Sequence, residues 1–73
     1  MAVDRIMTDI QRRSAKDDRA YSLELRLIDG KRVEFDFLKC ESGYLVVSDV
    51  NAPPDDVVFV PFAAILMVRP IWH

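Results

Sequence analysis

The chain has very little of the residues that stabilise small proteins through covalent bonds or metals. Its 73 residues include one cysteine, Cys40, and one histidine, His73. A single cysteine excludes an internal disulfide, and no Cys/His cluster is present for a structural metal. The core of so short a domain contributes only a few kcal/mol. We therefore expect a partner subunit to supply the missing stability.

Long apolar runs and an excess of positive charge are also absent. Asp4 and Asp9 interrupt the apolar pattern of the first ten residues, which predicts neither a signal peptide nor a membrane span. The lone cysteine fits a reducing, cytoplasmic setting. Ten Lys and Arg against twelve Asp and Glu give a net charge of −2. This balance argues against wholesale coating of nucleic acid and leaves room for a local basic patch.

Residue patterns that carry chemistry are sparse. The adjacent carboxylates Asp17-Asp18 and Asp55-Asp56 lack the further ligands that a metal ion needs. His73, at the chain end, has no partner in the sequence, whereas a catalytic base needs a fixed position. Cys40 falls in a predicted strand, where a free cysteine usually behaves as a small apolar residue. With no phosphate loop or nucleophile motif, the sequence predicts no enzyme, no metal and no cofactor.

The first segment has the spacing of an amphipathic helix. Its apolar residues fall at i, i+3, i+4 and i+7: Val3, Ile6, Met7 and Ile10. This spacing predicts a helix over residues 3–15. Because the apolar stripe is short, and a helix of this length is marginal in water, we expect it to dock on the rest of the domain.

From Tyr21 the hydropathy period changes to two, which is typical of half-buried strands. The alternation predicts a strand over 21–27 and a second from Val33, joined by Asp29-Gly30 as a tight primed turn. Such a hairpin places its leucines and phenylalanines on one face. After a turn at Glu41-Ser42-Gly43, residues 44–48 are expected to form a third strand.

The last two predicted strands are apolar without alternation. Residues 57–60 and 65–68 flank Pro61, which suits the start of a short 3₁₀ turn, and we expect Pro70 to stop the final strand. Both faces of these strands require burial, and a neighbouring copy of the chain is the simplest cover. The expected subunit interface therefore consists of Val57, Val58, Phe59, Val60, Ile65, Leu66, Met67 and Val68.

Together these elements predict one mainly β domain over residues 1–73. It consists of an N-terminal α-helix followed by a five-stranded, strongly bent antiparallel small barrel over 21–70, of the SH3-like or Sm-like kind. The pattern resembles the Sm-like family, and within it bacterial Hfq most. The resemblance lies in the Arg-Arg pair of the helix, the Asp-Gly turn within 27–33, and the run from Ala64 to Pro70, which is two residues shorter than the family's ending.

The resemblance implies a cyclic homo-oligomer in which the fourth strand of one subunit pairs with the fifth strand of the next. The ring size stays open. The uridine-binding Tyr-Lys-His segment of Hfq would fall at Pro61, Phe62 and Ala63, which provide no cation and no imidazole. The Arg-Gly-Asn signature of eukaryotic and archaeal Sm proteins is missing too. The uridine site is therefore expected to be absent.

A basic rim or face for single-stranded RNA remains as a candidate. The cations of the predicted helix resemble part of the arginine-rich rim of Hfq. Two more cations flank the hairpin tip, and one tyrosine lies near the position of a base-stacking aromatic in that family. The candidate residues are Arg12, Arg13, Lys16, Lys31, Arg32 and Tyr44. The alternatives are a solvated helix face with an Asp9–Arg13 pair, and Tyr44 as a core residue, which is favoured because aromatic strand residues are usually buried.

Two functions thus stay open. One is an Sm-like ring that binds single-stranded RNA; the other is an Sm-like or SH3-like scaffold for proteins that binds no nucleic acid, favoured by the acidic balance. A second resemblance, of Val50-Asn51-Ala52-Pro53 to the carbon storage regulator family, covers only a short stretch. Because that family begins with a strand and this chain with an amphipathic helix, we prefer the Sm-like interpretation.

Overall fold

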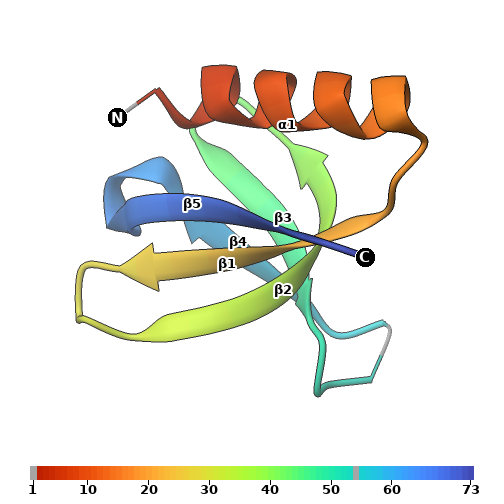
Figure 1. The fold of residues 1–73 in the computed structure, drawn as a ribbon. Coiled ribbons are helices and arrows are strands. Elements are labelled where there is room, and N and C mark those ends of the chain that lie inside the picture. The colour runs from red at the N-terminus through yellow and green to blue at the C-terminus, as the bar shows by residue number, and fades with distance from the viewer. Residues whose placement is uncertain (1, 54) are drawn as a thin grey trace.

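The computed structural model describes residues 2–53 and 55–73 as one helix followed by five strands (Figure 1). A 3₁₀ turn, η1 (Phe62–Ala64), joins the last two strands, as the sequence predicts. The other elements are α1 (Val3–Asp17), β1 (Tyr21–Leu27), β2 (Arg32–Cys40), β3 (Tyr44–Asp49), β4 (Val57–Pro61) and β5 (Ile65–Trp72). The predicted class, mainly β with an N-terminal helix, is confirmed.

The strands form one antiparallel sheet in the order β4-β3-β2-β1-β5. The fourth and fifth strands are therefore the two edges, an order consistent with an Sm-like fold. The register shifts between Phe37 and Lys39 in β2, and between Arg26 and Leu27 where β1 meets β5. Because bulges bend and twist a sheet, they help to curve it beneath α1, which runs along the top in Figure 1.

The β1–β2 hairpin has the predicted facing but a different turn. Leu23 lies opposite Phe35, so the apolar side chains share a face. The Gly30 N–H donates to the Leu27 carbonyl at 2.9 Å, and the Leu27 N–H donates to the Lys31 carbonyl at 2.9 Å. Gly30 has φ +88°, whereas Asp29 does not adopt positive φ as a primed turn would require. The loop is thus one residue longer than predicted, with glycine at its left-handed position.

Two elements extend beyond their predicted ends. α1 continues to Asp17, and Asp18 closes it in the left-handed conformation with its N–H donating to the Ser14 carbonyl. β5 does not stop at Val68 but runs through Pro70 to Trp72. Pro70 lies opposite Leu23 on an edge strand, where a residue without an N–H is tolerated because one side of the strand is unpaired.

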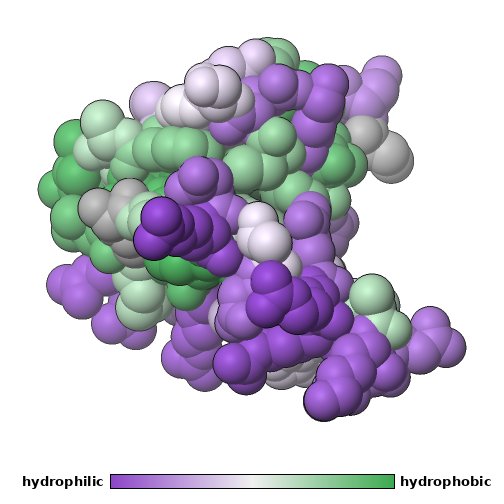
Figure 2. Space-filling view, turned by 90° about the horizontal axis from the view of Figure 1, so that it is seen from above, coloured by the Kyte–Doolittle hydropathy of each residue, from purple (hydrophilic) through white to green (hydrophobic). Residues whose placement is uncertain are grey.

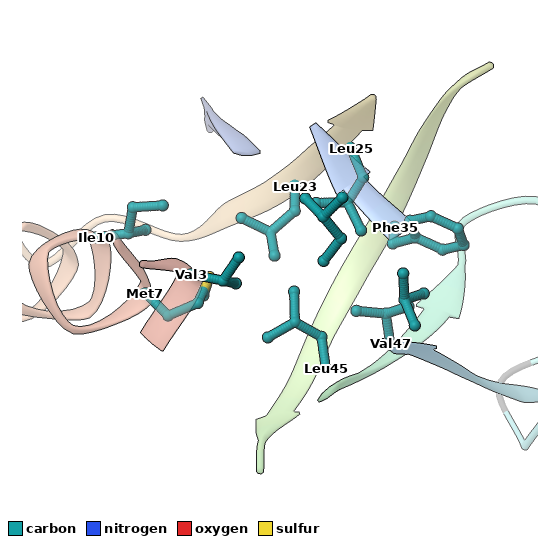
Figure 3. Close-up of a cluster of buried hydrophobic side chains, with 10 residues drawn as sticks. Val3, Met7, Ile10, Leu23, Leu25, Phe35, Leu45 and Val47 are labelled. Carbon is teal, nitrogen blue, oxygen red and sulfur yellow. The ribbon is translucent and has the colours of Figure 1, made fainter. Parts of the chain in front are cut away.

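The core lies between the helix and the concave face of the sheet (Figure 3). From α1, Val3, Met7 and Ile10 are at most 4% exposed, which confirms that the helix docks on the rest of the domain. The sheet contributes an apolar residue from every strand: Leu23, Leu25, Phe35, Leu45, Val47, Val60 and Ile65. Among the described residues, no helix is long and apolar enough to cross a membrane.

Two leucines on neighbouring strands allow a test of this core. Leu45 is fully buried and Leu38 is 49% exposed. We expect Leu45→Ala to lower the free energy of unfolding by about 2–5 kcal/mol, because it removes buried methyl groups and leaves a cavity. Leu38→Ala should change it by less than about 1 kcal/mol. Urea unfolding followed by circular dichroism measures both, and equal losses would contradict the assigned core.

Candidate functional site

The β4 edge exposes an apolar surface. Val57, Val58 and Phe59 are 41%, 37% and 62% exposed. Phe59 lies opposite Val46, on the face away from the core, and its ring meets Tyr44 edge to face with the centroids 6.0 Å apart. We call Tyr44, Val57 and Phe59 the apolar shelf. β4 contains no charged residue that would discourage another strand from pairing with it.

The β5 edge is apolar in its first half. Leu66 is 56% exposed, and it lies at the bulge, where it has no partner residue in β1. Met67 and Val68 are half-buried. Charge and proline appear only in the second half, at Arg69, whose Nη1 lies 3.8 Å from Glu24 Oε2, and at Pro70.

The expected interface residues therefore divide into two groups. Val60 and Ile65 are only 5% and 4% exposed and belong to the core of the subunit, so their assignment to a free contact surface is corrected. Their side chains point to the concave face, where Val60 lies opposite the buried Leu45. The other six keep exposed or half-buried surface. Hydrophobic surface also gathers on the left of Figure 2, the side on which η1 lies in Figure 1.

The three helix cations proposed for RNA are all exposed on α1. Arg13 Nε lies 3.1 Å from Asp9 Oδ2, so the i, i+4 pair anticipated from the sequence is present. Both side chains are more than half exposed, at 68% and 51%, and such pairs contribute little to stability. Within the part of the chain that the structure describes, Arg12 and Lys16 form no ion pair.

The remaining RNA candidates lie elsewhere. Lys31 and Arg32 are exposed at the tip of the β1–β2 hairpin, which lies at the lower left in Figure 1 and away from α1. Within one subunit the two cationic groups are thus not brought together. Tyr44 is 38% exposed, so its favoured assignment to the core is wrong. It precedes the inward-facing Leu45, and strand alternation directs its ring outward onto Phe59.

The chain end forms a cluster that the sequence interpretation missed. The Arg19 guanidinium lies 5.5 Å from the centroid of the Trp72 ring, and the Tyr21 ring meets that indole edge to face at 5.7 Å. Burial raises the pKa of the Tyr21 hydroxyl. The signal was that apolar residues resume after Pro70, at Ile71 and Trp72. Because the predicted strand ended at Pro70, the sequence interpretation did not include Trp72 in the sheet.

His73 is also held in place, contrary to the interpretation that it lacks a partner. Its Nε2 lies 3.1 Å from Ser22 Oγ, and its backbone N–H donates to the Ala20 carbonyl at 3.0 Å. The Ser22 hydroxyl donates its proton to Glu34 Oε2 at 3.0 Å, so the imidazole must donate to Ser22 Oγ. This arrangement ties the end of β5 to the start of β1 and does not present His73 as a base to Ser22.

In residues 2–53 and 55–73, no group of three His, Cys, Asp or Glu side chains is arranged so that it could bind a metal ion. Comparisons of the chain with protein-family models, with curated proteins and with solved structures find no match.

Cys40, at the end of β2, is half-buried. Its burial, together with the negative charges of Asp4 and Glu41, raises the pKa of the thiol. Since the thiolate is the reactive form, we expect a disulfide reagent at about pH 8 to label the folded chain more slowly than the chain in concentrated guanidinium chloride. Stopped-flow absorbance measures both rates. Faster labelling of the folded chain would show that Cys40 is an activated thiol.

Proposed function

We propose that the chain is a subunit of a closed homo-oligomer of the Sm-like kind, in which β4 of one copy pairs with β5 of the next. One observation carries the proposal: both edges of the sheet are open and apolar, with Phe59 62% and Leu66 56% exposed. Proteins normally protect edge strands with charges, prolines or covering segments. The first half of β5 and β4 up to Pro61 have no such protection.

The geometry of the two edges favours a ring. β4 and β5 are different surfaces, so their contact is head to tail, and repetition of a head-to-tail contact gives either a closed ring or an open filament. Closure leaves no strand edge exposed, which an open filament cannot achieve. The strand order with β4 and β5 outermost supports the same assembly through the resemblance to Sm-like proteins.

For its activity we favour binding of single-stranded RNA through the helix cations. Ring closure repeats Arg12 and Lys16 at equivalent positions, so that a weak patch on one subunit becomes a continuous basic surface. The exposed ring of Tyr44 offers a stacking platform that tolerates any base. Because Pro61, Phe62 and Ala63 provide neither cation nor imidazole, this surface has no means to prefer uridine.

A scaffold that binds proteins is the second candidate. It is favoured by the Asp9–Arg13 pair, which neutralises one of the proposed RNA contacts, and by the three acidic residues of α1 set among its four cations. The apolar shelf would then contact a protein partner.

The assembly is tested with two charged variants at the edges. We expect Phe59→Asp and Leu66→Asp each to dissociate the oligomer, because an unpaired charge buried in an interface costs several kcal/mol. Both residues are exposed in the subunit, so folding should persist. Sedimentation velocity at micromolar concentration reads the mass. Leu38→Asp, another exposed apolar position but on the interior strand β2, is the control and should keep the parent mass. A parent that sediments as an 8.4 kDa monomer contradicts the proposal.

RNA binding is tested with the variant Arg12→Ala plus Lys16→Ala. We expect its affinity for a short A-rich strand to fall on the order of tenfold at low salt, with a shallower dependence on salt, because fewer phosphates are neutralised. The parent should bind A-rich and U-rich strands about equally. Fluorescence anisotropy at two salt concentrations measures these affinities.

Lys39→Ala serves as the matched control, since Lys39 Nζ is paired with Glu41 Oε1 at 2.6 Å on β2. It should bind as the parent does. If the parent binds neither strand, the scaffold function takes precedence. A loss with Lys39→Ala as large as with the helix variant would place the RNA elsewhere.

A further inference from the structure

A groove of about 450 Å³ lies between α1 and the second half of β5. This is within the range of small-molecule sites, roughly 300–1,000 Å³. Its lining is apolar at five positions from two elements: Ile6, Ile10, Val68, Pro70 and Trp72. Of these only Ile10 is fully buried, so the other four keep surface that a ligand can cover.

The groove follows from how the helix and the last strand meet. Val3, Met7 and Ile10 hold α1 onto the core, while Ile6 lies to one side of that stripe and is only partly buried. β5 continues past Val68 to Trp72, so its second half runs beside the helix. The extension of β5 that the sequence did not predict therefore builds one wall.

One wall of the groove is preorganised. Trp72 is fixed by the Arg19 guanidinium, 5.5 Å from the ring centroid, and by the edge of Tyr21 at 5.7 Å. The backbone N–H of the next residue, His73, donates a hydrogen bond to the Ala20 carbonyl. An indole held by these contacts loses little side-chain entropy when a flat group packs against it.

The rim of the groove is positively charged. Arg5, Asp9 and Arg13 line it at i, i+4 and i+8, along one ridge of α1. Asp9 is engaged by Arg13 Nε at 3.1 Å. Arg5 forms no ion pair within the described chain. A guanidinium presents a planar fork of donors that matches a carboxylate or sulfonate.

We propose that this groove binds a small aromatic carboxylate, with the ring of the ligand against Trp72 and Pro70 and its anionic group on Arg5. Charge complementarity selects the anion, since two guanidinium groups face one carboxylate that is already paired. The site is contained in one subunit. It does not use Arg12 or Lys16, which are outside the lining, so it is independent of the proposed RNA contacts, and it shares only Val68 with the expected subunit interface.

The chain contains a single tryptophan, so the indole N–H signal of Trp72 reports on the groove directly. Isotope-labelled protein is titrated with naphthoate and with its neutral analogue naphthalenemethanol, and the signal is followed by NMR. We expect naphthoate to shift it saturably and to bind about tenfold more tightly than the alcohol, the effect of one charge-assisted hydrogen bond.

Two variants on the same helix test whether the charge of Arg5 determines the affinity for naphthoate. Arg5→Gln should lower the affinity for naphthoate about tenfold and leave the affinity for the alcohol unchanged, whereas Arg12→Gln should change neither affinity. Both positions are exposed, so neither variant disturbs the core. Equal affinity for the two probes, no shift of the Trp72 signal, or an Arg5→Gln variant that binds naphthoate as the parent does would each overturn the proposal.

Discussion

The docking of α1 on the concave face of the sheet is the contact on which the other features depend. Val3 and Met7 are at most 1% exposed, and they meet Leu23, Leu25 and Leu45 in a single small cluster. α1 is the one α-helix of the described chain, and it lies over the core. No other element of the described chain is left to cover the two sheet edges. The same docking sets α1 beside β5 and leaves the groove between them. The open apolar edges and the groove are therefore both consequences of how little chain is available to cover the sheet.

The uncovered edges differ in how they depart from ordinary edge strands. β4 is unprotected because its outward residues, Val57 and Phe59, are as apolar as its inward ones. In β5 the bulge turns Leu66 outward, whereas Arg69 and Pro70 mark the half that faces the groove. The two halves of β5 thus differ: the first half is an open apolar edge, and the second half forms one wall of the groove.

Alternating apolar residues predicted most of the fold, since period and facing are local properties. The pairing of Leu23 with Phe35, the helix stripe and the 3₁₀ turn all appear as expected. Errors arose where tertiary context decides. An edge strand tolerates Pro70, and only long-range contacts bring His73 to Ser22. The groove could not be predicted, because its two walls are more than fifty residues apart in sequence and meet only through the docking of α1.

The cations of α1 lie on two different ridges of the helix. The ridge that carries Arg5, Asp9 and Arg13 faces the groove, while Arg12 and Lys16, themselves four residues apart, form a second ridge outside its lining. The contact between Asp9 and Arg13, at 3.1 Å, holds the Arg13 guanidinium on the groove ridge. A sequence comparison with arginine-rich rims treats Arg12 and Arg13 as one unit because they are adjacent. On the helix they lie about 100° apart, and their surroundings assign them to different surfaces.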